Sequence, residues 1–200
     1  MFITQKFKII CMKQICIVFI LLSVFSFEKV NAQISDKWVI GLGVNIIDND
    51  GSPYSDLLSS RKGWNSITMP SSLTVEYKYN DMFSFEFHEA LNCFEKGKFV
   101  NKSIILKNQY VTATQLNGKF HINSLYSGLS WFDPYFNGGF GITTIDRNVL
   151  LQPNLAVGSN FWIAEGVALS FQGSANFGIS KVYNNFLMYT ISLKSNIKNL

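Results

Sequence analysis

The stretch LTVEYKYNDMFSFEFHE, residues 73–89, alternates apolar and polar side chains with a period of two. One apolar row occupies its first half, and a second row follows after a polar interruption. These rows are Leu73, Val75, Tyr77 and Tyr79, then Phe83, Phe85 and Phe87. A period of two is typical of a β-strand with one apolar and one polar face. The stretch therefore predicts two antiparallel strands joined by a tight turn.

The turn between these strands sets their pairing. If residues 80–82 (Asn-Asp-Met) form a three-residue loop, Tyr79 lies opposite Phe83, and both apolar rows share one side of the hairpin. Asn and Asp suit such a loop because they tolerate the left-handed backbone conformation that it needs. In this register Glu76 lies opposite Glu86 on the polar side.

A hairpin with one apolar and one charged face is compatible with two kinds of protein. A soluble sandwich buries the apolar face and exposes the charged one. A transmembrane barrel turns the apolar face toward lipid and the polar face toward the lumen. The remaining strands and their connections decide between the two.

The N-terminal residues 1–32 have the pattern of a secretory signal peptide. Three lysines before residue 14 precede an apolar run over residues 15–27. The small-residue site at residues 30–32 then predicts cleavage after Ala32, which leaves residues 33–200 as one domain. Translation from Met12 would leave the same pattern, so the start site stays open between Met1 and Met12.

Removal of this segment changes the charge and the cysteine content of the chain. Residues 1–32 contain four of the 17 basic and one of the 13 acidic residues, so the rest carries a net charge of +1. This near-neutral balance excludes a case for nucleic-acid binding. Cys93 is then the only cysteine, which excludes an internal disulfide. We expect no cofactor.

Six further segments alternate in the same way. They lie at residues 37–47, 114–125, 134–145, 150–161, from 167 onward, and 186–193. Polar stretches at residues 48–70 and 95–111 predict long loops between strands. With the hairpin, the chain has eight expected strands and no helical period after the signal. An even number of strands is typical of single-chain outer-membrane barrels. The fold class is therefore all-β, an eight-stranded antiparallel up-and-down transmembrane barrel.

Connection lengths and aromatic residues favour the transmembrane alternative. Connections after the second, fourth and sixth strands are short, whereas those after the first, third and seventh are longer, as expected for periplasmic turns and external loops. Large aromatic residues gather at the short-turn end, where they would form a belt at the membrane boundary. This expected periplasmic-side belt contains Trp38, Tyr77, Tyr79, Trp131 and Trp162.

Three segments resemble a known family. KWVIGLGVN at residues 37–45, PSSLTVEYKYNDMFSFEF at 70–87 and DPYFNGGFGITTID at 133–146 are similar to the barrel of the OmpA-type outer-membrane protein superfamily. The resemblance covers residues 37 to about 193. It implies an eight-stranded barrel with both termini on the periplasmic side. The chain leaves no room for the peptidoglycan-binding domain of OmpA itself, so a tethering role does not carry over.

The inward face of the predicted barrel carries six charged or titratable residues. They are Glu76, Lys78, Glu86, His88, Lys119 and His121. Because eight strands leave a lumen that side chains fill, and because buried charges need partners, we expect a network of ion pairs and hydrogen bonds there.

Two more specific interpretations of polar residues, as a catalytic trio and as a calcium loop, have less support. Ser84, Glu86 and His88 share one strand face and contain the residue types of a lipase, but alternate residues lie ~6.5 Å apart, too far for direct hydrogen bonds. Residues 48–51 (Asp-Asn-Asp-Gly) resemble the start of a calcium loop, yet Ser59 stands where the bidentate Glu belongs. The sequence therefore predicts neither a catalytic nor a metal site.

The favoured function is a small, porin-like barrel of the cell envelope, non-enzymatic, with a structural or interaction role. It is located in the outer membrane, in contact with lipid and lipopolysaccharide, and we expect a monomer. Any ligand or protein partner would bind the external loops 48–70 and 95–111. The alternatives are a barrel enzyme that modifies lipid A or phospholipid, and a soluble periplasmic barrel that binds a small apolar ligand. The charged inward rows weigh against the latter.

Overall fold

The computed structural model describes residues 37–49, 64–67, 70–101, 103–125, 129–178 and 185–197. The expected signal peptide, its cleavage site and most of the expected loop 48–70 lie outside the described residues.

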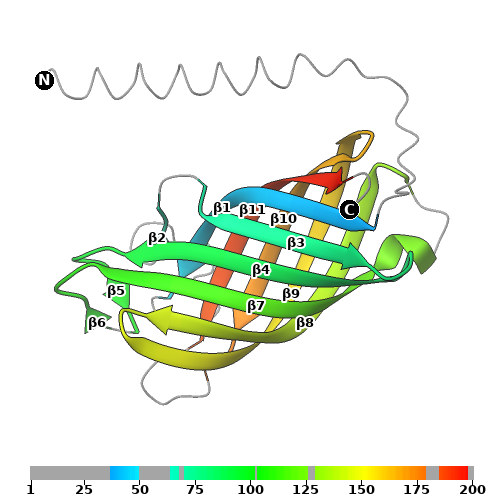
Figure 1. The fold of residues 1–200 in the computed structure, drawn as a ribbon. Helices are drawn as coiled ribbons and strands as arrows, with labels where there is room; N and C mark the ends of the chain where they lie inside the picture. Colours follow the sequence, from blue (N-terminus) through cyan, green and yellow to red (C-terminus); the bar gives the residue numbers. More distant parts are fainter. Residues whose placement is uncertain are drawn as a thin grey trace, which may run out of the picture. The chain divides into compact units, whose positions relative to one another are not determined.

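Eight long antiparallel strands form a closed barrel (Figure 1). They are β1 (Trp38–Asp48), β3 (Ser72–Lys78), β4 (Phe83–Phe94), β7 (Gln109–His121), β8 (Phe132–Ile145), β9 (Asn148–Ala164), β10 (Val167–Asn176) and β11 (Phe186–Ile197). Each strand pairs with its neighbour along the chain, and β11 pairs with β1 from Trp38↔Ile197 to Asp48↔Leu187. This last pairing closes the sheet and removes its edges. The predicted all-β, eight-stranded antiparallel barrel is confirmed.

The β3–β4 hairpin has the predicted register. Glu76 pairs with Glu86, and the backbone N–H of Tyr79 donates to the carbonyl of Phe83 at 3.0 Å. The side-chain oxygen of Asn80 accepts hydrogen bonds from the backbone N–H groups of Met82 and Phe83, at 2.9 and 2.7 Å. An Asn side chain stabilises a turn when it accepts a hydrogen bond from the backbone N–H two residues later. The three-residue loop is therefore confirmed.

Several boundaries differ from those predicted. β4 continues to Phe94 and β7 begins at Gln109, so residues 95–108 connect them and contain two short strands, β5 (Phe99–Val100) and β6 (Ser103–Ile104). The prediction missed these strand ends because most of their inward residues, Ala90, Phe94, Val111 and Ala113, are apolar, which weakens the alternation. β7 also ends at His121 rather than at Leu125, where a 3-10 helix, η2 (Ile122–Leu125), follows.

The expected loop 48–70 contains one described element, β2 (Trp64–Asn65), which pairs with the end of β1. Among the described residues no helix is long and apolar enough to cross a membrane.

Alternate residues of each long strand face opposite sides of the barrel wall, as predicted. The apolar rows face outward and stay exposed, with Phe85 61%, Leu116 67% and Phe140 65% accessible. The polar rows face the lumen and are buried, as in Glu86 (1%) and Asn137 (4%). The barrel is therefore apolar outside and mainly polar inside.

The lumen is filled in layers along the barrel axis. The end that carries the long loops holds an apolar plug, made of Ile47, Ala90, Phe94, Val100, Val111, Ala113, Ile145, Leu150, Phe186 and Met188. Neutral amides such as Gln115 and Gln152 fill the middle. Charged side chains fill the short-turn end. The sequence predicted a polar filling only, so the apolar plug is an addition to that prediction.

Candidate functional site: the charged layer of the lumen

Two glutamates and two lysines form the centre of the charged layer. The ammonium of Lys119 contacts Glu76 Oε2 at 2.6 Å and also contacts Glu86 Oε2. Lys194 lies farther from the same two oxygens, at 3.3 and 3.2 Å. All four side chains are at most 3% exposed. Because two negative and two positive charges balance, the cluster needs no counterion from solvent.

Aromatic rings lie close to three lysines at this end of the lumen. Lys119 Nζ lies 4.3 Å from the ring centroid of Tyr135, and Lys194 Nζ lies 5.7 Å from it. Nearer the short turns, Lys78 Nζ stands 5.1 Å from the ring of Trp162. A cation within about 6 Å of a ring face is attracted to it. The ring of Tyr135 therefore adds a favourable contact to Lys119 and Lys194, and the ring of Trp162 adds one to Lys78.

A serine, a histidine and an aspartate lie in line beside this cluster. Ser84 Oγ is 2.9 Å from His121 Nε2, and His121 Nδ1 is 3.0 Å from both carboxylate oxygens of Asp133. The amide of Asn160 donates to Asp133 at 2.9 Å. Each distance falls within the range of the nucleophile–base–acid arrangement that activates a serine.

The surroundings of this trio favour a structural role. The hydroxyl of Ser84 donates to Glu76 Oε1 at 2.7 Å, and Nε2 of His121 lies 3.2 Å from the same oxygen. His121 thus lies between two carboxylates, and Ser84 is only 1% exposed. A hydroxyl that is bonded to a carboxylate and closed to solvent can order the network.

Five of the six predicted inward residues come together in this layer, and one does not. Glu76, Glu86, Lys119 and His121 are directly linked, and Lys78 adjoins them over the ring of Trp162. His88 instead bonds to Ser72 Oγ at 3.0 Å, outside the ion-pair cluster. The trio of Ser84, Glu86 and His88 is therefore not assembled, because each member bonds to residues of other strands.

Three members of the layer were not among the predicted residues. Lys194 continues the inward row of β11 after Ser192, but the predicted strand ended at Leu193. Asp133 and Tyr135 precede Asn137 on the inward row of β8, where the predicted strand began at residue 134. The same two-residue period, followed one step beyond the expected boundaries, would have found Lys194 and Asp133.

Four of the five expected belt residues lie at the outer surface of the short-turn end. Trp38 and Tyr77 pack with ring centroids 4.9 Å apart, Trp131 is 46% exposed and Tyr79 69% exposed. Trp162 is 4% exposed and covers the charged layer from inside, so its assignment to the belt is wrong. The alternation along β9 explains this. Leu155 and Val157 face outward, so every second residue from Ala156 onward, including Trp162, faces the lumen.

Cys93 is a buried free thiol near the end of β4. No group of His, Cys, Asp or Glu within the described ranges has the arrangement of a metal site.

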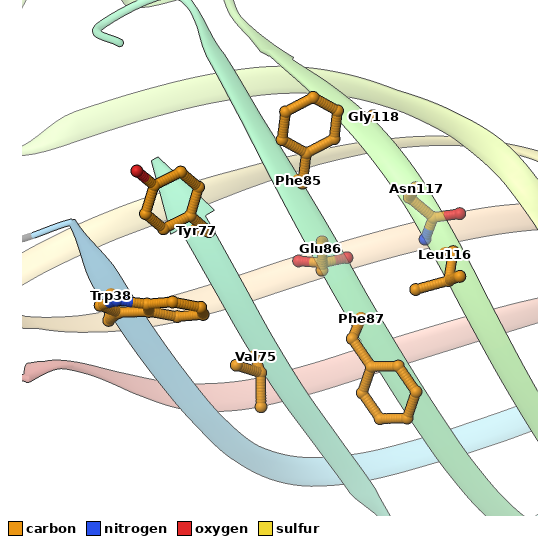
Figure 2. Close-up of a pocket in the computed structure, with 9 residues that line it drawn as sticks. All are labelled: Trp38, Val75, Tyr77, Phe85, Glu86, Phe87, Leu116, Asn117 and Gly118. Atoms are coloured by element: carbon orange, nitrogen blue, oxygen red, sulfur yellow. The ribbon is translucent and has the colours of Figure 1, made fainter. Parts of the chain in front are cut away.

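A furrow of about 410 Å³ runs along the outer surface over β4 and β7. Figure 2 shows Phe85 and Phe87 of β4 in this furrow, with Val75 and Tyr77 of β3 on one side and Leu116 of β7 on the other. The furrow belongs to the outward face, so it is separate from the charged layer.

Comparison with solved structures identifies several barrels with the same architecture. The N-terminal β-barrel domain of Pseudomonas aeruginosa OprF matches with a TM-score of 0.52 and 10% identity, over 80% of this chain and 97% of that one. Neisserial surface protein A matches with a TM-score of 0.56 and 11% identity, over 80% of this chain and 97% of that one. Ail, the attachment invasion locus protein of Yersinia pestis, matches with a TM-score of 0.52 and 11% identity, over 82% of this chain and 100% of that one.

No protein-family model matches the chain, and a search of curated proteins finds no match either. The structural likeness, at about 10% identity, concerns the fold. It confirms the barrel that the resemblance to OmpA-type proteins implied. The chain has the eight-stranded outer-membrane β-barrel fold.

Proposed function

We propose that this protein is an outer-membrane barrel with a structural or interaction role, whose closed lumen serves stability and whose external loops carry any specificity. The apolar outer surface is the observation that carries this proposal. Large apolar side chains are exposed on every long strand, among them Leu42, Leu73, Phe85, Leu116, Phe140, Leu155, Phe171 and Ile191. Water-soluble monomers rarely expose contiguous apolar patches larger than a few hundred Å². A hydrocarbon medium around the wall accounts for this surface.

The orientation follows from the connections. Residues 79–82, 122–131 and 165–166 connect strands at one end, and connections 49–71, 95–108 and 177–185 start from the other, where the first two are the longest of the barrel. The β8–β9 connection, Asp146-Arg147, is a short turn at that same end. Short turns face the periplasm in outer-membrane barrels. The charged layer then lies toward the periplasm and the apolar plug toward the outside.

The β5–β6 hairpin is the described part of the external surface best suited to a partner. Val100 and Ile105 pack into or against the apolar plug, whereas Ile104 and Leu106 are 56% and 82% exposed. Lys96, Lys98 and Lys107 flank these exposed apolar side chains, with Lys98 paired to Glu95 at 3.0 Å and Lys107 to Asp146 at 3.1 Å. An apolar and basic surface of this kind suits an anionic partner such as the phosphates of lipopolysaccharide.

Migration in gels with and without boiling, applied to outer-membrane fractions, tests the proposal. A closed membrane barrel resists detergent until it is heated, so the unheated protein should run as a compact band that shifts after boiling. Recovery of the protein in the soluble periplasmic fraction, with no heat-dependent shift, would contradict it. The exposed apolar rows would then have to be covered by a protein partner.

A second candidate function, acyl transfer at Ser84, is favoured by the distances in the Ser84–His121–Asp133 line. It ranks below the first because Ser84 is buried and bonded to Glu76. A fluorophosphonate probe labels activated serines, so its reaction with the folded barrel separates the two. Labelling that disappears in both Ser84→Ala and His121→Gln would establish the enzyme. Equal absence of labelling in the parent protein and in both variants would remove this candidate.

A further inference from the structure

One charged side chain stands on the outer wall of the barrel, away from both of its ends. Glu89 of β4 pairs with Leu73 of β3 and with Thr114 of β7. His88 and Ala90, on either side of it, are buried in the lumen, so the alternation turns the Glu89 side chain outward. Among the residues that the structure describes, any other charged residue of an outward row lies at a strand end.

Glu89 lies at the depth of the hydrocarbon. β4 has 12 residues, Phe83–Phe94, and a strand crosses the bilayer in about 9–11. Glu89 stands midway along β4, and the outward side chains of Leu73, Leu91 and Leu116 around it are 37%, 45% and 67% exposed. A carboxylate in such a medium is costly, and ionisable residues at this depth usually pair with an opposite charge and mark a functional site.

The barrel itself gives this carboxylate a hydrogen bond but no cation. Thr114 Oγ1 donates to Glu89 Oε2 at 2.6 Å. A carboxylate has about four acceptor positions, and a hydroxyl brings no positive charge. The ion pairs among the described residues all involve other carboxylates. Thr114 therefore fixes the position of the carboxylate and leaves its charge uncompensated.

The compensating charge has to come from outside the barrel. The outward rows of the described strands contain no Lys or Arg, so neither a neighbouring strand nor the wall of a second copy supplies one. The amines of lipids lie at the level of the headgroups, outside the hydrocarbon. A basic side chain carried by another membrane protein reaches the required depth.

The wall beside Glu89 suits an apolar segment. Phe87 and Leu116 form the next outward pair toward the short turns, and both line the furrow on the outer surface (Figure 2). The furrow is open above Gly118, because a Cβ placed there would meet nothing closer than the carbonyl oxygen of Gly138, at 4.0 Å. The carboxylate thus stands next to a concave apolar surface.

We propose that Glu89 and Thr114 form a docking point for a membrane protein that presents one lysine or arginine among apolar side chains. The basic group pairs with the Glu89 carboxylate, which Thr114 holds in place, and apolar side chains of the partner cover the adjacent wall. The inference rests on the membrane location proposed above. It assigns a partner to the wall of the barrel, in addition to the external loops.

A synthetic transmembrane peptide measures this contact. It has about 20 leucine and alanine residues, no tryptophan, a dansyl group at one end and one lysine at its centre. A matched peptide has leucine in place of the lysine. Energy transfer from the tryptophans of the barrel to the dansyl group, in phosphatidylcholine vesicles, reports binding of each peptide. The lysine peptide should bind about tenfold more tightly, the factor that a hydrogen bond to a charged group contributes.

Three variants locate the contact. Glu89→Gln removes the charge at nearly constant size and should bring the binding ratio of the two peptides close to one. Glu95→Gln is the matched control, since Glu95 follows the end of β4 and pairs with Lys98 at 3.0 Å. It should keep the ratio of the parent. Glu89→Lys reverses the charge and should prefer a peptide with a central glutamate over the lysine peptide.

Several outcomes would overturn the proposal. A ratio near one in the parent would show that Thr114 alone satisfies Glu89. An unchanged ratio in Glu89→Gln would place the contact elsewhere on the barrel. A parent that sediments as a dimer in detergent micelles, together with a monomeric Glu89→Gln, would assign this face to a second copy.

The heat-dependent gel shift distinguishes failure of this docking point from failure of the proposed function. A reconstituted barrel that shifts on boiling but shows no preference for the lysine peptide contradicts the docking point alone. A protein without the shift, recovered in the soluble periplasmic fraction, contradicts the proposed function and the docking point with it. If Glu89→Lys does not give the compact band, Glu89→Gln tests the contact without it.

Discussion

Lys119 joins the two halves of the charged layer. Its ammonium contacts Glu76 and Glu86 while Tyr135 lies beside it, whereas Lys194 reaches the same oxygens only at 3.2–3.3 Å. In a buried cluster, removing one partner leaves a charge without compensation, which costs more than the pair itself contributes. The two lysines should therefore differ in importance although they share both partners.

Substitution of Lys119 by Met should lower the free energy of unfolding by about 3–5 kcal/mol, because one carboxylate charge is left unbalanced in the lumen. Lys194→Met should cost less, since its contacts are longer. Urea unfolding of the barrel in detergent micelles, followed by tryptophan fluorescence, measures both changes.

The double variant Lys119→Met/Glu86→Gln restores the charge balance and should recover a large part of this loss. Equal instability of the single and the double variant would show that packing, and not charge, makes Lys119 important.

The backbone N–H of Trp162 on β9 donates to the carbonyl of Trp131 before β8 at 2.8 Å. The two side chains nevertheless differ in environment, since Trp131 packs against the ring of Phe161 and is exposed whereas Trp162 is buried in the lumen. Single-tryptophan variants should separate them. Trp131, 46% exposed at the outer surface, should be quenched by brominated phospholipids, while Trp162 should keep most of its fluorescence in the same vesicles. Similar quenching of both would place Trp162 at the lipid surface after all.

At the level of elements, the β5–β6 hairpin closes the barrel at its long-loop end. Val100 of β5 lies in the apolar plug, whereas Ile104 of β6 is 56% exposed. The backbone N–H of Asn101 donates to the carbonyl of Asn49 after β1, so the hairpin is held on both sides of the barrel mouth. Within one hairpin, Val100 is thus part of the apolar plug, whereas Ile104 is exposed at the surface.

Replacing Val100 by Asp should destabilise the protein by several kcal/mol, since it places an unpaired charge among apolar side chains. Ile104→Asp is the matched control and should change stability by no more than about 0.5 kcal/mol, as surface substitutions usually do. The same urea titration measures both. Equal costs at the two positions would show that the hairpin does not seal the plug.

The elements also show which features a two-residue period can predict. The β3–β4 hairpin was predicted in full because its apolar and charged rows contrast at every step and Asn80 marks the turn. The ends of β4 and β7 were missed where Phe94, Val111 and Ala113 face inward, because apolar inward residues weaken the contrast between the two faces there. The contacts among Glu76, Lys119 and Lys194 depend on three strands at once, so no single segment contains the signal for them.

At the scale of the whole molecule, two unlike barriers lie in series along the lumen. The apolar plug consists mainly of hydrocarbon side chains, next to which Asn92 is bonded to Asn45 and Asn65, and the charged layer is internally balanced. Eight strands leave a lumen that side chains fill. Passage of ions would require both layers to open together.

We therefore expect no stable conductance steps when the protein is added to a planar lipid bilayer. Lys119→Met should stay silent as well, since it disturbs only the charged layer and leaves the plug in place. Current recordings at constant voltage check this. Regular channel openings in Lys119→Met but not in the parent would show that the ion pairs alone close the lumen.

The pairing of β1 with β11 constrains the order in which the strands can pair during folding. Trp38 and Ile197 become neighbours, so the first strand has to wait for the last one before its hydrogen bonds are complete. Contacts between such distant parts of a chain form slowly, and until then both strands expose unpaired backbone groups that invite association with other chains. The two open edges therefore have to be shielded from other chains until β11 has paired with β1.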